Sequence, residues 1–282
     1  LNPPLSGNHS LRGVPLYLSL YLMTKPTAII TMMTSDDFLP GVQCLFYSLA
    51  SKNCHNADKI VLVTDAISKP TRIQLKRIRG LAIREVEAIP NPHASTCKVE
   101  GWVNSGYTKL RVWELEEYSR AIYLDADCLV VGSLERLFSC SSGEDWNGFS
   151  AVPDVFPPDK FNAGVMVLKP NSEVFRDMME KINLPSHDNG DTGFLNSYFS
   201  DWYSDMPPSS RLPFGLNAQR ILHWFTHSRE PGYWDGINPL DVVHYSSSPK
   251  PWDAKNEKKG ELEILWWDYF TRGVALGGLG GF

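Results

Sequence analysis

The stretch Ala121-Ile-Tyr-Leu-Asp-Ala-Asp127 indicates the fold class, because an apolar run stops at two carboxylates. Ala121–Leu124 has the composition of a strand buried inside a sheet, and Asp125-Ala126-Asp127 lies where that strand ends. Two further apolar runs precede it, at Thr27–Thr34 and Lys59–Thr64, and polar residues follow each of them. Ligands of parallel α/β sheets bind beyond the carboxyl ends of the strands, so these run ends are where a site is expected.

Helical patterns separate the strands. Apolar residues recur at helical spacing over residues 38–51, a basic amphipathic helix is expected over residues 69–79, and a third helix over residues 107–118. Leu81–Ile89 is expected to be a strand of alternating charge. Strands that alternate with helices predict βαβ crossovers and a mostly parallel sheet flanked by helices, which is an α/β fold.

The composition is that of a globular protein and excludes several classes. The chain has 282 residues, of which 43% are apolar and 21% charged, and its net charge is −5. The acidic balance argues against a nucleic-acid partner. Five cysteines without a Cys-x-x-Cys pair argue for reduced thiols rather than a zinc finger or a disulfide framework. The chain contains no run of about 18 apolar residues, so the sequence predicts no membrane-spanning helix. We therefore expect the protein to lie in the cytoplasm, or in the Golgi lumen if an anchor precedes this chain.

The pair Asp125 and Asp127 is the first candidate site. Like charges this close raise a pKa or recruit a cation. Oxygen ligands suit Mg²⁺ or Mn²⁺, and such an ion would bridge to a diphosphate. A solvated acidic turn is the alternative.

His244 and Lys250 form the second candidate. Asp241–His244 is expected to be a strand that ends in an imidazole, and the loop after it carries one lysine that could face a phosphate. A hydrogen-bonded histidine at a strand end and a solvated lysine are the alternatives.

Two further motifs combine small and acidic residues. Asn162-Ala163-Gly164 opens an apolar strand, where small residues let a ligand approach the backbone; a simple turn is the alternative. Asp188-Asn-Gly-Asp191 places two carboxylates in a turn before a helix, and the alternative is that Asp191 caps that helix.

Other nucleotide-binding classes lack their sequence signatures here. The chain contains neither G-x-G-x-x-G nor G-x-x-x-x-G-K-[ST], which removes the main support for a dinucleotide-dependent dehydrogenase or a P-loop protein. A nucleotidyltransferase would need a basic, glycine-rich loop after the first strand, where Thr34-Ser-Asp-Asp37 is acidic instead.

In order and spacing these pieces resemble the glycogenin-like family 8 glycosyltransferases, over roughly Ala28 to Trp252. The six-residue step from His244 to Lys250 agrees with that family. The matching pieces are Thr31–Thr34, Tyr107–Leu110, Tyr123–Asp127, Phe161–Gly164, Asp188–Asp191, Leu212–Phe214, and His244 with Lys250–Trp252.

The resemblance implies a GT-A fold, which is a single domain built on a Rossmann-like sheet. It also implies a UDP-sugar donor, a Mn²⁺ ion with Mg²⁺ as the alternative, and retention of anomeric configuration. By motif match, the metal ligands would be Asp125, Asp127 and His244.

The same resemblance places the donor. Lys250 and Lys109 would meet its diphosphate or sugar, and Asp188 and Asp191 would contact the sugar hydroxyls, with Asp191 nearest the reacting centre. The remaining donor-binding positions would be Met32, Thr34 and Phe38 at the uridine, Asn162 and Ala163 at the sugar, and Ala126 and Ser247.

The implied function is transfer of a glucosyl or glucuronosyl unit to a glycan, polyol, lipid or protein acceptor. The catalytic residues would be Asp191, Asp188 and Lys250, with attack either by Asp191 or by the acceptor from the donor's own face. A homodimer is a further candidate assembly. The alternative function is a catalytically idle relative that binds a nucleotide sugar or a carbohydrate.

Three positions depart from the family pattern. Counting from Leu212-Pro-Phe214 puts Trp224 where the glycogen-priming members have an acceptor tyrosine, so self-glucosylation is not expected at that position. Thr192 replaces a usual glutamine and Ser247 a usual glycine, and both changes bear on donor choice. Segments such as Phe161–Pro170 resemble the plant branch, which includes glucuronosyltransferases acting on xylan or sphingolipid.

The chain is expected to have three parts. Residues 1–24 are an N-terminal extension, non-native or disordered; residues 25–256 form the GT-A domain; residues 257–282 are an aromatic segment and a Gly-rich tail. Trp266-Trp267 and Tyr269-Phe270 are expected to pack back on the domain, and a position at a membrane surface is the alternative.

Overall fold

The computed structural model describes residues 26–52, 57–95, 106–140, 145–230, 232–253 and 260–275. The predicted N-terminal extension over residues 1–24 lies outside the described residues, as do Cys54, Cys97 and the tail from residue 276. The strands are β1 (Thr27–Met33), β2 (Asp58–Val63), β3 (Leu81–Glu85), β4 (Arg120–Leu124), β5 (Cys128–Val130), β6 (Phe149–Pro153), β7 (Phe161–Leu168), β8 (Ala218–Gln219) and β9 (Val242–His244).

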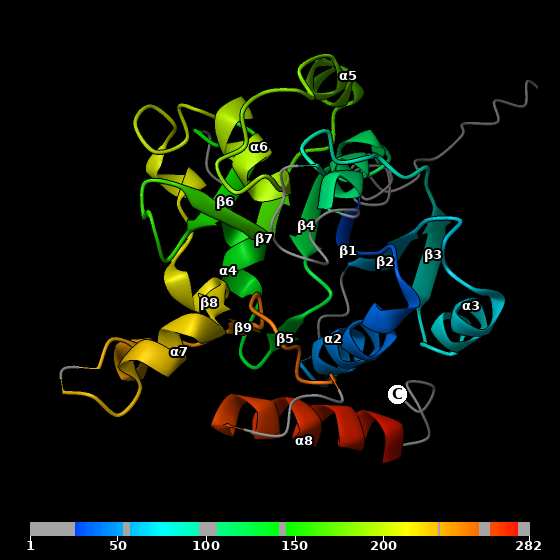
Figure 1. Ribbon diagram of the computed structural model, residues 1–282, viewed down its shortest axis with the longest axis vertical. Helices are drawn as coiled ribbons and strands as arrows, with labels where there is room; N and C mark the ends of the chain where they lie inside the picture. The colour runs from blue at the N-terminus through cyan, green and yellow to red at the C-terminus, as the bar shows by residue number, and fades with distance from the viewer. Residues whose placement is uncertain are drawn as a thin grey trace, which may run out of the picture.

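A six-stranded sheet with the order β3-β2-β1-β4-β7-β6 forms the centre of the described structure (Figure 1). β3, β2, β1 and β4 run parallel to one another, while β7 and β6 are antiparallel to their neighbours. The predicted mostly parallel α/β sheet is therefore confirmed. The carboxyl ends of β1, β2 and β4 lie at one edge, where the sequence places Asp125 and Asp127.

Helices cover both faces of this sheet. The helices are η1 (Asp36–Phe38), α2 (Leu39–Ser51), α3 (Lys69–Lys76), η2 (Gly106–Glu114), α4 (Glu135–Ser139), α5 (Ser172–Glu180), α6 (Asp191–Tyr198), η3 (Pro208–Ser210), η4 (Phe214–Leu216), α7 (Arg220–Thr226), η5 (Trp234–Gly236) and α8 (Glu261–Ala275). α2 and α3 share one apolar core with the sheet, and η2, α5 and α6 share the other. Figure 1 shows the two groups on opposite sides of β1 and β4.

Burial on both faces explains the unbroken apolar runs of the parallel strands. Ile30 and Tyr123 belong to the core under η2, whereas their chain neighbours Ile29 and Ile122 belong to the core under α2. All four side chains are at most 1% exposed. A strand covered on both faces needs apolar residues at every position rather than at alternate ones.

A second, three-stranded sheet with the order β5-β9-β8 lies beside the central one. β5 pairs with β9 antiparallel, with Cys128 opposite His244, and β8 pairs with β9 parallel. This pairing brings the histidine at the end of β9 next to the two aspartates that precede β5. The sequence predicts a strand over Asp241–His244, which contains β9, but it does not predict β8.

Three elements differ from the sequence predictions. The strand expected over Leu81–Ile89 ends at Glu85, because its partner β2 ends opposite it at Val63. The α-helix expected over residues 107–118 is the 3₁₀ helix η2 over Gly106–Glu114. The helix expected over residues 69–79 ends at Lys76.

The C-terminal helix α8 packs along α2, as Figure 1 shows at the bottom of the molecule. Trp266 is fully buried, and it contacts the rings of Trp252, Trp267 and Phe270. The prediction that this aromatic segment packs back on the domain is confirmed. Gly273, assigned from the sequence to the tail, belongs to α8. A Cβ there would lie 2.8 Å from the ring of Tyr47, so the residue is small because helix and ring approach closely.

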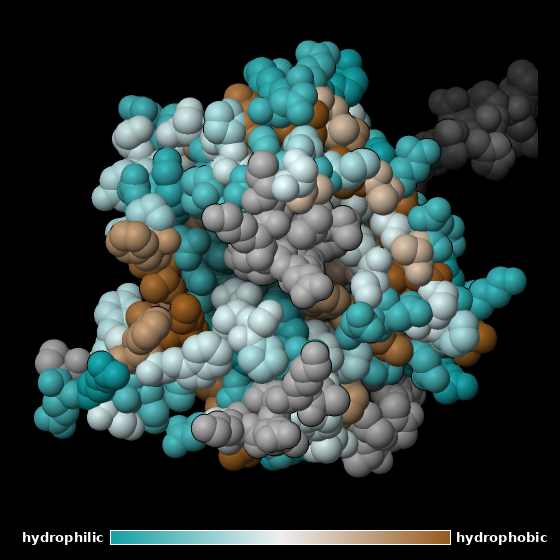
Figure 2. Space-filling model, in the orientation of Figure 1, coloured by the Kyte–Doolittle hydropathy of each residue, from teal (hydrophilic) through white to brown (hydrophobic). Residues whose placement is uncertain are grey.

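The face of the molecule drawn in Figure 2 is mostly polar. Figure 2 shows a largely hydrophilic face with a group of apolar residues at its left side, near β6 and β8 of Figure 1. None of the helices described is long and apolar enough to cross a membrane. Cys44, Cys128 and Cys140 are free thiols, as predicted for these three.

Substitution of Trp266 tests the packing of α8. We expect Trp266→Ala to lower the free energy of unfolding by about 3–5 kcal/mol, because it empties a buried indole site. Ile264→Ala is the matched control on the same helix: Ile264 is 59% exposed, so a change within about 0.5 kcal/mol is expected. Urea denaturation followed by circular dichroism measures both. Equal effects of the two substitutions would contradict the buried position of Trp266.

Candidate active site

The turn Asp125–Asp127 joins the two sheets at the carboxyl edge of β4. The amide of Asp125 donates to the carbonyl of Gly164 on β7 (2.8 Å), and the amide of Cys128 donates back to the carbonyl of Asp125 (3.0 Å). The turn is therefore held on both sides by backbone hydrogen bonds. Its two carboxylates lie on different sides of the site, and each meets its own lysine.

Lys109 on η2 neutralises the first carboxylate. Its Nζ lies 3.1 Å from Asp125 Oδ1 and 2.6 Å from Asp191 Oδ2, and it donates to the carbonyl of Ala163 (3.0 Å). The ammonium also lies 4.9 Å from the centre of the Tyr123 ring. Burial lowers the pKa of Lys109, but the two carboxylates raise it by more, so the pKa lies above its usual value and the side chain stays charged.

Lys250 neutralises the second carboxylate, and His244 lies beside it. Lys250 Nζ lies 2.5 Å from Asp127 Oδ2, and His244 Nε2 lies 3.2 Å from Asp127 Oδ1. The Asp127 side chain is only 8% exposed. Burial raises the pKa of Asp127, but Lys250 and His244 lower it by more, so the pKa lies well below its usual value.

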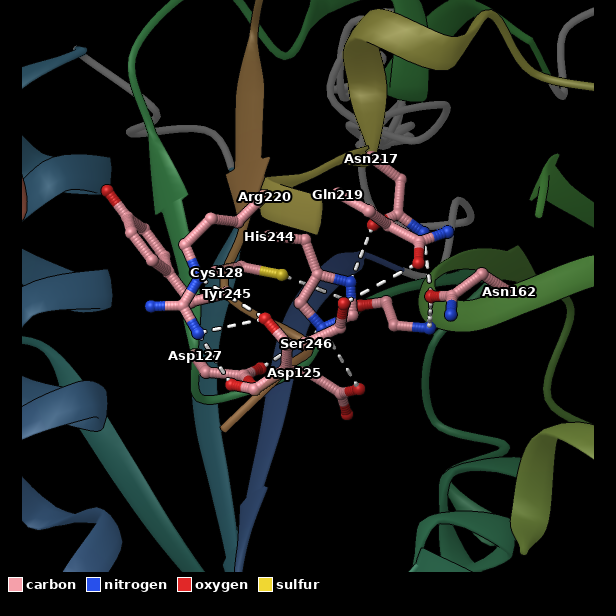
Figure 3. Close-up of polar contacts among 12 residues, drawn as sticks. Asp125, Asp127, Cys128, Asn162, Asn217, Gln219, Arg220, His244, Tyr245 and Ser246 are labelled. Carbon is pink, nitrogen blue, oxygen red and sulfur yellow. Dashed lines mark hydrogen bonds and ion pairs between the residues drawn. The ribbon is translucent and has the colours of Figure 1, made fainter. Parts of the chain in front are cut away.

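A row of amide groups fixes the ring of His244. Its Nδ1 donates to Asn217 Oδ1 (2.8 Å), and Asn217 in turn donates to Asn162 Oδ1 (3.0 Å). Nε2 is thereby turned toward the carboxylates of Asp125 and Asp127, at 3.8 and 3.2 Å, as Figure 3 shows. A Cβ on residue 164 would lie 2.2 Å from His244 Cε1, so Gly164 makes room for the ring.

The donor set of Asp125, Asp127 and His244 fits a divalent cation. Two carboxylates and an imidazole suit Mn²⁺, and the hydrogen bond to Asn217 orients the imidazole as partners of metal-bound histidines do. At this turn, the ligand atoms that all lie within 4.8 Å of one another belong to Asp127, Cys128 and His244, and Asp125 is not in that group. Burial raises the pKa of the Cys128 thiol well above its usual value, which favours the protonated thiol, a poor ligand.

The two aspartates of the Asp188–Asp191 turn are placed differently. Asp188 Oδ1 accepts hydrogen bonds from the Ser186 hydroxyl (2.8 Å) and from the amides of Gly190 (2.8 Å) and Gly193 (2.9 Å), so it anchors the start of α6. The suggestion that Asp191 caps this helix is wrong: Gly190 is the N-cap residue, and Asp191 reaches across to Lys109. Asp191 is thus joined to Asp125 through one lysine.

The predicted uridine positions lie at the end of β1. Met32 is in β1, Thr34 follows that strand directly, and Phe38 is in η1. The Phe38 ring contacts the Trp252 ring edge-on at 5.8 Å between centroids, two residues beyond Lys250.

The predicted sugar and loop positions also lie at this edge. Asn162 and Ala163 line β7 beside Lys109 and Asn217, and Ala126 lies between the two aspartates. Ser247 accepts hydrogen bonds from Arg220 through its hydroxyl and its carbonyl. The structure thus brings the predicted residues together at one edge of the sheet.

The sequence analysis missed Asn217 and Arg220. Arg220 is fully buried: it pairs with Glu263 of α8 (2.7 Å) and donates to the carbonyls of Ser247 (2.7 Å) and Pro249 (2.8 Å). It therefore holds the loop that carries Lys250. Both residues lie within eight positions of Leu212, in the segment that follows the Leu212-Pro-Phe214 motif. Their polar side chains so close to a family motif are the one sequence feature that could have indicated a role at the site.

Known proteins match this chain over most of its length. The family described as "Glycosyl transferase family 8" matches residues 29–256. Inositol phosphorylceramide glucuronosyltransferase 1 of Arabidopsis thaliana is 31% identical over 248 residues, covering 82% of this chain and 43% of that protein. Glycogenin-1 of Caenorhabditis elegans is 33% identical over 230 residues, covering 80% of this chain and 50% of that protein. The chain spans about half the length of these two relatives.

Solved structures agree on the fold. An active-site mutant of the galactosyltransferase LgtC superimposes with a TM-score of 0.63 at 16% identity, covering 87% of this chain and 95% of LgtC. At that identity the similarity shows the fold alone. The fold is the GT-A fold, as the sequence resemblance implies.

Removing Lys109 tests the neutralisation of the buried carboxylates. Lys109→Met keeps the volume but leaves Asp125 and Asp191 without their cation. We expect the free energy of unfolding to fall by about 3 kcal/mol, the low end for a broken buried ion pair, because Asp125 keeps 27% of its side chain exposed.

Lys181→Met is the matched control for this substitution. Lys181 forms an exposed pair with Asp177 one turn away on α5, so its loss should cost about 0.3–0.5 kcal/mol. Urea unfolding at neutral pH measures both variants. A loss for Lys109→Met no larger than that of the control would show that the buried pair is not important for stability.

Proposed function

The chain belongs to glycosyl transferase family 8, and on that premise we propose that it is a metal-dependent, retaining glycosyltransferase with a UDP-sugar donor. The proposed donor sugar is a glucosyl or glucuronosyl unit, as the names of the two relatives suggest. One observation supports the proposal above the others. Two aspartates, a histidine and two lysines converge at the carboxyl edge of the parallel strands.

We propose that Asp125, Asp127 and His244 hold Mn²⁺, with Mg²⁺ as the alternative. A bound ion would supply Lewis-acid stabilisation of the charge on the departing UDP. The protein's part is to keep both carboxylates ionised and the imidazole aimed at them. Lys250 and the hydrogen bond from His244 to Asn217 support that role.

Lys250 is proposed to contact the donor diphosphate. In the described geometry its Nζ contacts Asp127 and donates to the carbonyl of Tyr245 (2.8 Å). A lysine is a flexible point charge, so it can turn from a carboxylate to a phosphate that carries more negative charge. Arg220 would hold the backbone of the loop in place while the side chain moves.

Asp191 is proposed to act beside the anomeric carbon. Its carboxylate faces Lys109 at the end of β7, next to the backbone of Ala163. In the reaction, the bond between the anomeric carbon and the phosphate oxygen breaks and UDP leaves with the electron pair. A bond to the acceptor oxygen forms, and the proton of the acceptor hydroxyl passes to the departing phosphate. The carboxylate can stabilise positive charge on the carbon while the acceptor attacks from the face that UDP leaves, or it can attack the carbon itself and then be displaced by the acceptor; both routes retain configuration. Asp188 supports the site by fixing the start of α6.

The acceptor is proposed to approach over an exposed aromatic surface. Trp224, Phe225 and Tyr233 are 47%, 59% and 58% exposed. The Trp224 ring lies 4.5 Å from the guanidinium of Arg220, which itself contacts Ser247. Aromatic rings of this kind suit the apolar face of a sugar or a lipid chain. Trp224 carries no hydroxyl that could accept a sugar.

UDP release from a donor panel tests the function. The panel is UDP-glucose, UDP-glucuronate, UDP-galactose and UDP-xylose, each with Mn²⁺ and with a chelator. We expect Mn²⁺-dependent release from UDP-glucose or UDP-glucuronate, because water can replace the acceptor slowly. Absence of release from all four, together with no binding of UDP, would contradict the proposal.

Asp127→Asn is the variant for the same assay. It should lower the rate of release at least about 100-fold with the fold unchanged, since a ligand of the charge-stabilising centre is lost. Asp177→Asn, a half-exposed aspartate on α5, is the control and should retain the activity. Near-normal activity of Asp127→Asn in Mn²⁺ would remove Asp127 from the metal site.

A further inference from the structure

A second group of metal-ligand side chains lies away from the aspartate turn, where α7 ends and α8 begins. His223 and His227 are four residues apart, and Glu261 opens α8. Glu261 Oε2 lies 3.1 Å from His227 Nε2 and 3.9 Å from His223 Nε2. One ligand atom from each of the three lies within 4.8 Å of the others. We name these residues the α7–α8 cluster.

The two imidazoles are held in place by their surroundings. Their rings stack with centroids 4.3 Å apart and planes 14° apart, and the His223 ring also meets the Trp234 ring edge-on at 5.1 Å. His223 is only 12% exposed at the side chain, and His227 is 31% exposed. The positions of the two rings are therefore fixed by their contacts with neighbouring side chains.

Asp235 orients His227. Its Oδ1 lies 2.7 Å from His227 Nδ1, and its Oδ2 accepts a hydrogen bond from the amide of Ser228 (2.8 Å). With Nδ1 engaged by a carboxylate, Nε2 is the nitrogen left to face Glu261. A carboxylate on the far nitrogen is the usual partner of a histidine that binds a metal.

We propose that the α7–α8 cluster binds a divalent transition-metal ion, with Zn²⁺ as the fitting probe. Two histidine nitrogens and one carboxylate form a three-ligand zinc set that leaves one position for water. The excess of nitrogen over oxygen donors disfavours Mg²⁺ and Ca²⁺, which separates this cluster from the aspartate-rich turn. Glu261 is 74% exposed, so its side chain is free to adjust to an ion.

Because the cluster lies between α7 and α8, a bound ion would affect how these two helices are held together. Glu261 precedes Glu263 on α8 by two residues, and Glu263 pairs with the buried Arg220 that holds the loop of Lys250. An ion bound between α7 and α8 would tie the first turn of α8 to α7. It should therefore raise the melting temperature of the whole chain.

Zinc titration of the full chain tests the proposal. The Asp127→Asn background removes a ligand of the other candidate centre, calorimetry with Zn²⁺ after chelator treatment measures the binding that remains, and the cluster variants assign that binding to the α7–α8 cluster. We expect one Zn²⁺ per chain and a higher melting temperature on its addition. Adding His227→Ala should weaken binding at least about 100-fold, and adding Asp235→Asn about 10–100-fold.

Two further variants keep the result interpretable. Glu261→Gln changes an exposed side chain, so it tests the cluster without disturbing the core, and it should weaken Zn²⁺ binding at least about tenfold. His93→Ala, which removes a histidine outside the cluster, should leave binding unchanged. The proposal is overturned if the Asp127→Asn protein binds no Zn²⁺, or if His227→Ala and Glu261→Gln bind it as tightly as their parent. None of these readouts depends on glycosyl transfer.

Discussion

Asp125 and Asp127 place two carboxylates at the end of a buried strand, where negative charge is costly without a positive partner. The surrounding structure supplies one lysine to each. Lys109 arrives from η2 on one face of the sheet, and Lys250 from the loop after β9 on the other side. The second small sheet exists at this place because β5 continues directly from the aspartate turn and pairs with β9. The pairing of β5 with β9 thus brings the loop of Lys250 to the aspartate turn, so the contact between the two sheets and the neutralisation of Asp127 depend on each other.

The two lysines are held with different firmness, and this difference matters for function. Lys109 is 4% exposed and has three oxygen partners around it, so it is a fixed part of the floor of the site. Lys250 is 15% exposed and lies on a loop whose backbone Arg220 secures. The fixed ammonium of Lys109 can hold the carboxylates of Asp125 and Asp191 in one orientation. The more mobile ammonium of Lys250 can bind a ligand that enters and leaves the site. Because Arg220 pairs with Glu263, the position of α8 also affects this loop.

The sequence predicts well those features that depend on local pattern. The runs at β1, β2 and β4 carry apolar residues on both faces because both faces of the sheet are covered, and this pattern is visible in the sequence. Asp125, Asp127 and His244 are recognisable because carboxylates and an imidazole follow such runs. Features that depend on tertiary contact are not predicted. The two-residue β8 exists only through pairing with β9, and Asn217 and Arg220 gain their roles from a strand and a loop at least 27 positions away. The helix over residues 107–118 has helical spacing, but it is a 3₁₀ helix in the structure and ends at Glu114.

We propose that the carboxylates paired with lysines form the centre that receives a metal and a nucleoside diphosphate. Calorimetric titration with UDP, in Mn²⁺ and in chelator, measures this binding with neither donor sugar nor acceptor present. Mn²⁺ should lower the Kd of UDP at least about tenfold, which corresponds to about 1.4 kcal/mol. Equal affinity for UDP with and without Mn²⁺ would contradict it.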